Sequence, residues 1–275
     1  MDRHLRGLAA ALLAISLAAP VCAQDLPEYA CWRTATPPVI DGRGDDAAWQ
    51  QAPAMHLVDV RFLSGDQYHS RPTEARMLWD ADNLYVLFAA TDPDVWSTLD
   101  QRDDPLWDQE VVEIFFDPDG DGLNYVEIEV NPINTIVDLV VSKPFRLGGT
   151  GHFEWSPTYT TATDVAGTAN DASDQDESWS MELALPWSAL RTDILDVPGD
   201  RSLPPAAGDQ WRFNFYRYER LRSGGRPTST IEYSAWSPVG RVDFHVPERF
   251  GVVTFEDAGT AVGPSSWGGV KGATR

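Results

Sequence analysis

The chain has 275 residues, of which 43% are hydrophobic, and a formal net charge of −21 that results from 42 acidic and 21 basic residues. So acidic a surface repels nucleic acid and anionic lipid, which argues against both as partners, while it tolerates neutral ligands and attracts divalent cations. The length suffices for one large all-β domain or two small domains.

The first 23 residues are typical of a secretory signal peptide. Basic residues occur in Met1–Arg6, an apolar run follows over 8–19, and small residues end the segment at Ala23. We therefore expect cleavage after Ala23 and a secreted or periplasmic protein. The apolar run is too short to span a bilayer, so no membrane association is expected after cleavage. Cys31 is then the one remaining cysteine, and the fold must be stabilised by packing or metal instead of an internal disulfide.

Strand signals dominate the chain from residue 37 to residue 256. We predict strands at 55–62, 73–79, 84–91, 111–116, 125–130, 135–142, 179–185, 211–218, 230–236 and 250–255. Turn-forming residues at 80–83 and 117–122 predict two hairpins. In 125–130, apolar and acidic residues alternate strictly, which predicts a half-buried strand.

The spacing of these segments predicts the fold class. Many short strands at intervals of about 8–12 residues indicate an all-β, antiparallel β-sandwich, jelly-roll-like, with long loops. One short helix is predicted at Pro186–Leu190 because proline favours a first helical turn. We assign 24–36 to an N-terminal lead-in, 37–256 to the sandwich and 257–275 to a flexible tail rich in Gly, Ser and Ala.

Trp107 stands out because it lies in the acidic, polar stretch that precedes a strand, between Asp103 and Asp117. An indole in such surroundings is poorly suited to a core. A flat apolar ring beside carboxylates suits a sugar, which has an apolar C–H face and an edge of hydroxyls. The alternative is a loop tryptophan that folds back onto the rim of the sandwich.

Several short motifs occur in a fixed order along the chain. They are Val39-Ile40-Asp41-Gly42 with Asp45 and Trp49, Leu78-Trp79-Asp80, Asp108 with Val112–Phe115 and Asp117, Trp179–Glu182 with Pro186-Trp187, Trp211–Asn214, Trp236-Ser237-Pro238 and Pro247–Gly251. Together they resemble the family 9 carbohydrate-binding module over nearly the whole predicted mature chain.

The resemblance implies a β-sandwich that binds sugars, often at the chain ends of plant polysaccharides, and carries structural calcium. It also implies that two aromatic residues sandwich a sugar ring. Trp107, six residues before Glu113, matches the first tryptophan and its acidic hydrogen-bonding partner, and Trp236 is the expected second wall. The family also uses a basic side chain near the sugar, whereas residues 127–134 contain no Arg or Lys.

An acidic loop follows the predicted strand 111–116. Asp117, Asp119 and Asp121 with Gly122 match the opening of an EF-hand loop, but Ile128 occupies the position of its bidentate glutamate and the flanks are strands. A calcium site of another kind at this hairpin tip is therefore the prediction, and a solvated turn is the alternative. A second oxygen-rich candidate comprises Asp92, Asp94 and Asp104.

These observations predict a secreted carbohydrate-binding protein that is auxiliary to carbohydrate catabolism. Its expected partner is a neutral polysaccharide or oligosaccharide, and no organic cofactor and no catalysis by the chain alone are expected. One alternative is a glycoside hydrolase or an accessory subunit of one, which would need a carboxylate pair such as Glu127 and Glu129. Others are a surface-assembly domain, or a haem site between Met77 and His152 or His245.

Overall fold

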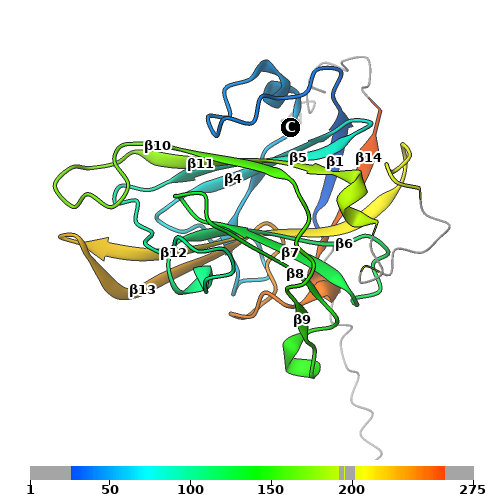
Figure 1. Cartoon of the computed structure of the whole chain (residues 1–275). Helices are drawn as coiled ribbons and strands as arrows, with labels where there is room; N and C mark the ends of the chain where they lie inside the picture. The colour runs from blue at the N-terminus through cyan, green and yellow to red at the C-terminus, as the bar shows by residue number, and fades with distance from the viewer. Residues whose placement is uncertain (1–25, 192–194, 196–201, 258–275) are drawn as a thin grey trace, which may run out of the picture.

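The computed structural model describes residues 26–191, 195 and 202–257 (Figure 1). The predicted signal peptide, 1–23, and residues 258–275 of the predicted tail lie outside the described residues. Within the described ranges, no helix is both long and apolar enough to cross a membrane.

Two layers of β-strands face each other, as Figure 1 shows. The first layer consists of β10 (Thr160–Ala166), β11 (Ser178–Pro186), β5 (Asn83–Thr91), β4 (Thr73–Trp79) and β2 (Met55–His56). The second consists of β12 (Gln210–Ser223), β6 (Val111–Asp117), β7 (Tyr125–Val130), β8 (Ile136–Val141), β9 (Gly151–His152), β13 (Arg226–Ala235) and β3 (Val58–Asp59). The predicted all-β sandwich is thus confirmed.

The two layers are joined along one side by β1 (Glu28–Arg33) and β14 (Gly251–Glu256). β1 runs parallel to both β14 and β4, and β14 runs antiparallel to β12. Every other described ladder is antiparallel. Residues 28–33 of the predicted lead-in, 24–36, thus form a strand of the sandwich.

The main core lies between the layers. Side chains that alternate along the strands point inward from both sides, and Phe88 of β5 meets Phe215 of β12 edge-to-face with ring centroids 5.7 Å apart. In the second layer Phe213 and Phe215 stack along β12 at 6.0 Å. Burial of these large rings is the main source of stability in a chain whose described cysteine, Cys31, is free.

Each layer also buries its outer face under a covering segment. The loop that contains η1 (Ala47–Gln51) packs Trp49 against Leu78 and Tyr85 of the first layer. The chain after β13 packs Phe244 and Phe250 against the second layer, where Phe244 stacks on Tyr216 at 4.0 Å. The second covering segment forms part of the candidate site.

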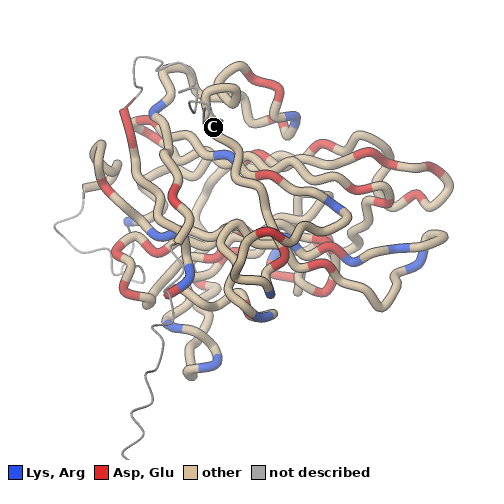
Figure 2. The backbone as a smooth tube through the Cα atoms, turned by 180° about the vertical axis from the view of Figure 1, so that it is seen from behind, with Lys and Arg blue, Asp and Glu red and all other residues tan. Residues whose placement is uncertain are grey.

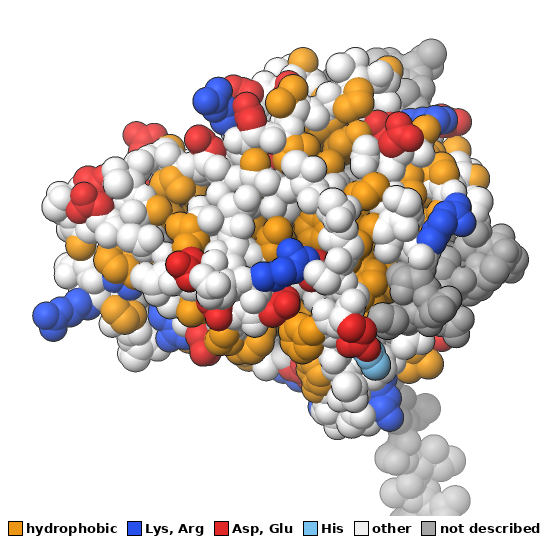
Figure 3. Space-filling model, in the orientation of Figure 1, with side chains coloured by type: hydrophobic (Ala, Val, Ile, Leu, Met, Phe, Trp, Pro, Cys, Tyr) orange, Lys and Arg blue, Asp and Glu red, His pale blue; other side chains and the backbone are white. Residues whose placement is uncertain are grey.

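The predicted hairpins are present as β4–β5 and β6–β7. The predicted helix at 186–190 is a short 3-10 helix, η4 (Trp187–Leu190). The predicted strand 55–62 is instead two short strands, β2 and β3, which pair with different neighbours. Beyond the predictions, β10 adds an edge strand to the first layer. Acidic residues recur along much of the tube in Figure 2, with fewer basic residues between them, and Figure 3 shows side chains of both signs on one face.

Candidate functional site

A pocket of about 260 Å³ lies on the outer face of the second layer. Its lining combines carboxylates from the sheet with aromatic side chains from the covering loops. The residues are Trp107, Glu113, Glu127, Glu129, Leu139, Phe145, Phe153, Tyr218, Asp243, Phe244 and His245. The volume lies just below the usual range for small-molecule sites, so it fits a ligand of about one sugar ring. We call this the Trp107 pocket.

The Trp107 side chain is held at the rim by a short turn, η2 (Leu106–Asp108). Leu106 is buried in the outer-face core, whereas the indole of Trp107 is 40% exposed. The backbone is fixed on the other side because the Arg220 guanidinium donates to the Asp108 carbonyl over 2.9 Å. The turn therefore presents one large aromatic surface beside the pocket without packing it away.

The prediction that Trp236 forms the opposite wall is wrong. Trp236 is 8% exposed and belongs to the core between the layers, where it packs edge-to-face on Tyr29 and Phe215. The pocket lies on the other face of the sheet, so Trp236 and Trp107 are not brought together. Within the described lining, the most exposed other rings are Phe145 and Phe153.

Three glutamates form the floor of the pocket. Glu113 of β6 is directly opposite Glu129 of β7, and Glu127 lies two residues before Glu129 on the same face. The structure thus brings Glu113 to the same pocket as Trp107. All three carboxylates are buried, so the predicted half-exposed face of strand 125–130 is wrong: the covering loops exclude solvent from it.

Burial raises the pKa of every glutamate in the floor, because a charged carboxylate loses its hydration there. The pKa of Glu127 rises to about 8. Repulsion from Glu127 raises the pKa of Glu113 further. Repulsion from Glu113 and Glu127 likewise raises the pKa of Glu129. The floor therefore retains protons near neutral pH and can both donate and accept hydrogen bonds.

His245 completes one side of the pocket as a neutral imidazole. Burial lowers its pKa to about 4. Its Nδ1 lies 3.0 Å from the Tyr125 hydroxyl, and its Nε2 lies 4.0 Å from Glu127. With the Tyr125 hydroxyl donating to Nδ1, the proton of the neutral ring is on Nε2 and points toward the glutamate.

A larger hollow, of about 700 Å³, lies across η2 from the Trp107 pocket and is lined by Trp96, Glu110 and Arg222 among others. The Arg222 guanidinium lies 4.0 Å from the centre of the Trp96 ring. That cation–π contact already occupies one face of the indole. The Trp107 pocket is therefore the better candidate.

The acidic loop between β6 and β7 brings its carboxylates together as the sequence suggested. Single oxygen atoms of Asp117, Asp119 and Asp121 lie within 4.8 Å of one another. Asp117 accepts hydrogen bonds from the amides of Gly120 and Gly122 at 2.9 and 2.8 Å, and burial raises its pKa to about 7. Hard oxygen ligands of this kind fit calcium, which would need further oxygens from the loop or water.

The other predicted oxygen-rich group is not assembled. Asp94 pairs with Arg222 and Asp104 accepts from the Gln101 amide. Asp92 instead converges with two residues that the sequence did not suggest, Glu110 and Glu219. Arg217 donates to Asp92 over 2.9 Å and contacts Glu219, so a buried guanidinium already balances part of this charge.

The residues proposed for haem ligation lie apart in the described structure. Met77 is buried in the core between the layers, whereas His245 is on the outer face of the second layer. His152 is paired with Glu154 over 2.9 Å at the surface. The haem alternative therefore finds no common site among these residues.

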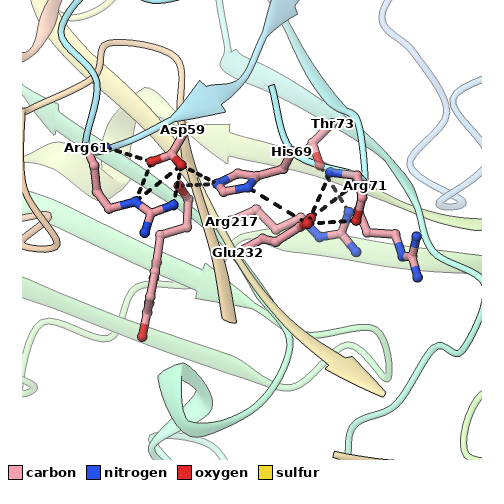
Figure 4. Close-up of polar contacts among 9 residues, drawn as sticks. Asp59, Arg61, His69, Arg71, Thr73, Arg217 and Glu232 are labelled. Atoms are coloured by element: carbon pink, nitrogen blue, oxygen red, sulfur yellow. Dashed lines mark hydrogen bonds and ion pairs between the residues drawn. The ribbon is translucent and has the colours of Figure 1, made fainter. Parts of the chain in front are cut away.

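A further set of charges joins the loop before β4 to β13 and β3 (Figure 4). Asp59 accepts from Arg61 at 2.9 Å, and His69 contacts both Asp59 and Glu232 at 3.5 and 3.9 Å. Glu232 also accepts from the Ser70 hydroxyl over 2.7 Å. Because these groups satisfy one another, the cluster is structural.

The motifs that open the domain are likewise structural. The Glu182 carboxylate, fully buried, accepts from the Trp49 indole at 2.7 Å and from the amides of Asp41 and Gly42 at 3.0 and 2.8 Å. Gly42 has φ +89° and a side chain there would meet the backbone of Thr163. One carboxylate thus links the motif at 39–49 to that at 179–182.

Comparison with known proteins identifies the fold and the family. Three solved structures cover 84–86% of the chain at 18% identity: a candidate carbohydrate-binding protein from Bacteroides uniformis (TM-score 0.61, 100% of that chain) and a family 9 carbohydrate-binding module from Caldicellulosiruptor kristjanssonii with cellotriose (0.54, 98%) or glucose (0.52, 100%).

A curated relative is endo-1,4-beta-xylanase A of Thermotoga neapolitana, 34% identical over 90 residues. That match spans 33% of this chain and only 8% of the xylanase. Residues 40–258 match the family described as carbohydrate family 9 binding domain-like, which is most of the chain. The chain therefore belongs to the carbohydrate family 9 binding domain-like family.

Proposed function

We propose that the Trp107 pocket binds a saccharide, with one pyranose ring stacked on the Trp107 indole and its hydroxyls hydrogen-bonded to the glutamates of the floor. The observation that carries this proposal is an indole 40% exposed at the rim of a pocket whose floor consists of buried carboxyl groups. Apolar ring faces and fixed polar groups are the two features that a sugar requires. Membership of a carbohydrate-binding family supports it.

Phe145 and Phe153 replace Trp236 as candidates for the second aromatic contact. Both line the pocket, and they are 45% and 43% exposed. They come from the chain between β8 and β10, so the two sides of the site would be formed by separate loops. The ligand class is a polysaccharide or oligosaccharide, for which the cellotriose and glucose complexes of the fold relatives suggest a neutral starting probe.

The test compares wild type with Trp107→Ala by calorimetric titration with cellotriose and xylotriose. Loss of a central aromatic contact should weaken binding by at least about thirtyfold. Tyr68→Ala is the matched control, because Tyr68 is 65% exposed and is not part of the pocket lining. Retained affinity in Trp107→Ala, with an unchanged unfolding curve, would exclude this site.

The same samples separate binding from catalysis. We expect binding without release of reducing sugar from xylan or cellulose, consistent with a protein that assists carbohydrate catabolism and does not hydrolyse the chain itself. Release that persists in purified protein and disappears in Glu127→Gln would instead favour a glycoside hydrolase.

The proposed setting is outside the cytoplasm, in the periplasm or the medium. The basic and apolar pattern of residues 1–23 supports export with cleavage after Ala23. N-terminal sequencing of protein recovered from the native host should begin at Gln24. Recovery of uncleaved protein from the cytosol would contradict this assignment.

A further inference from the structure

Among the described residues, the Trp107 pocket brings together three carboxyl groups with no cation beside them to favour their ionised form. Its floor presents Glu113, Glu127 and Glu129, and the described lining contains no lysine or arginine. The fourth acidic residue of the lining, Asp243, is different because Arg241 and Arg146 lie 3.3 and 3.7 Å from its carboxylate. The three glutamates therefore lack a cationic partner within the pocket.

Glu129 gives a second, independent indication. Its side chain is 1% exposed and Oε2 has no hydrogen-bond partner among the described residues. A buried carboxylate oxygen without a partner is costly, and such orphaned atoms in native proteins call for a ligand or water. Because Glu129 lines the pocket, a ligand bound there would lie beside this carboxyl group.

The arrangement differs from a metal cage. In the described structure two other acidic groups converge so that three oxygens lie within 4.8 Å of one another, and the pocket glutamates are not among them. What surrounds the glutamates is aromatic, with the rings of Trp107, Phe145 and Phe153 partly exposed. Carboxylates beside exposed rings favour an organic ammonium, through charge-assisted hydrogen bonds and cation–π contacts.

Building on the saccharide-binding function proposed above, we propose that the pocket prefers a sugar that carries a free amine, such as a glucosamine unit, over the neutral ring of the same size. The ring would stack on Trp107, and its ammonium would donate to the floor at Glu129 and its neighbours Glu113 and Glu127. An N-acetylated unit has lost the charge and would not gain this contact. The partner is thus a partly or fully deacetylated amino-sugar chain.

The test is calorimetric titration of the full chain with four probes at one pH and low salt: the glucosamine trimer, the N-acetylglucosamine trimer, cellotriose and putrescine. We expect the glucosamine trimer to bind at least about tenfold tighter than either uncharged trimer, which is the usual effect of a charge-assisted hydrogen bond. Putrescine, an ammonium without a ring, should bind much more weakly than the glucosamine trimer.

Glu129→Gln and Glu113→Gln should each reduce the preference for the glucosamine trimer over cellotriose to near unity, because the loss of affinity should be much larger for the glucosamine trimer than for cellotriose. Glu177→Gln is the matched control, because it removes one negative charge at an exposed position away from the pocket. Unfolding curves of the variants confirm that they fold. Trp107→Ala should abolish binding of all trimers.

The outcomes separate the two proposals. Cellotriose binding that depends on Trp107, with no gain for the glucosamine trimer, overturns the amino-sugar preference and leaves the saccharide site intact. The amino-sugar preference is also overturned if putrescine binds as tightly as the glucosamine trimer. It is overturned likewise if the glucosamine trimer still binds Trp107→Ala and this binding disappears with added salt, because both results indicate a non-specific attraction to an acidic protein. Failure of every trimer to bind removes the saccharide site as well.

Discussion

Both outer faces of the sandwich bury glutamates, but the carboxylates have very different contacts. On the first layer, Glu182 is enclosed by a covering loop and accepts three hydrogen bonds from Trp49, Asp41 and Gly42. On the second layer, Glu113, Glu127 and Glu129 lie under a covering segment that leaves a pocket, and Oε2 of Glu129 has no hydrogen-bond partner in the part of the chain that the structure describes. A satisfied buried carboxylate holds a fold together, whereas an unsatisfied one beside exposed rings is available to a ligand.

The largest effect on stability is expected at Glu182, whose carboxylate has its hydrogen bonds satisfied. Glu182→Ala leaves three donors without an acceptor, those of Trp49 and Gly42 buried, and should cost about 3–5 kcal/mol in the free energy of unfolding. Urea denaturation measures it, and Glu182→Gln, which keeps one acceptor oxygen, should lose less. A loss below about 1 kcal/mol for Glu182→Ala would show that the three hydrogen bonds of Glu182 contribute little to stability and that the two faces do not differ in this respect.

The pH dependence of stability tests the buried glutamates of the second layer, which form the floor of the Trp107 pocket. A carboxylate whose pKa is raised on folding binds more protons in the folded state, so stability falls as pH increases from the unfolded value toward the folded one. For Glu127, with a folded pKa of about 8 against 4.5, the window is pH 4.5 to 8. We expect a loss on the order of 3 kcal/mol between pH 5 and 8 from this group.

Other raised groups contribute to the same slope, including Glu219 at about 8 and Asp117 at about 7, so the decisive quantity is a difference. Glu127→Gln should flatten the curve of unfolding free energy against pH. A slope identical to wild type would mean that the pocket floor does not hold its protons.

The β6–β7 loop provides a third arrangement, in which backbone amides satisfy part of a carboxylate group and calcium would satisfy the rest. A cation bound only by the folded state at a hundred times its Kd adds about 2.7 kcal/mol. We therefore expect calcium to raise Tm and chelation to lower it, with the response lost in Asp119→Asn. Asp174→Asn is an exposed control. Identical melting curves with calcium and with chelator would contradict the site.

The smallest effect on stability is expected for Glu129→Gln. Replacing a carboxyl group that has an orphaned oxygen by an amide of the same shape should change the free energy of unfolding by less than about 1 kcal/mol, and in the stabilising direction above neutral pH. Thermal unfolding at pH 8 measures it beside Glu182→Gln. A loss of several kcal/mol in the free energy of unfolding of Glu129→Gln would show that Glu129, like Glu182, stabilises the fold.

The parts of the fold predicted from sequence are those that local chemistry determines. The hairpins at 73–91 and 111–130 were predictable because Asp, Asn and Gly between alternating segments favour turns. β10 was missed because its sequence is polar and its burial is slight at the sheet edge, and β1 because its pairing with β14 is set by distant residues.

The site was only partly predictable for a related reason. The acidic setting of Trp107 and the family resemblance suggested Trp107 and Glu113, and the structure places both at one pocket. The face to which Trp236 points depends instead on its place after β13: Ala235 lies opposite Tyr216 on the pocket side, so the next residue points to the core. Likewise, the burial of Glu127 and Glu129 depends on loops that are remote in sequence, which alternation within 125–130 does not encode.

The parallel pairing of Glu28 with Val252 has a consequence for biogenesis. β1 can pair with β4 early, but its pairing with β14 must wait until residues 251–256 have been made, so the seam that unites the layers closes late. Contacts of such high sequence separation fold slowly. Until β14 is in place, the edges of β1 and β12 that it joins are therefore unpaired and open to wrong pairing.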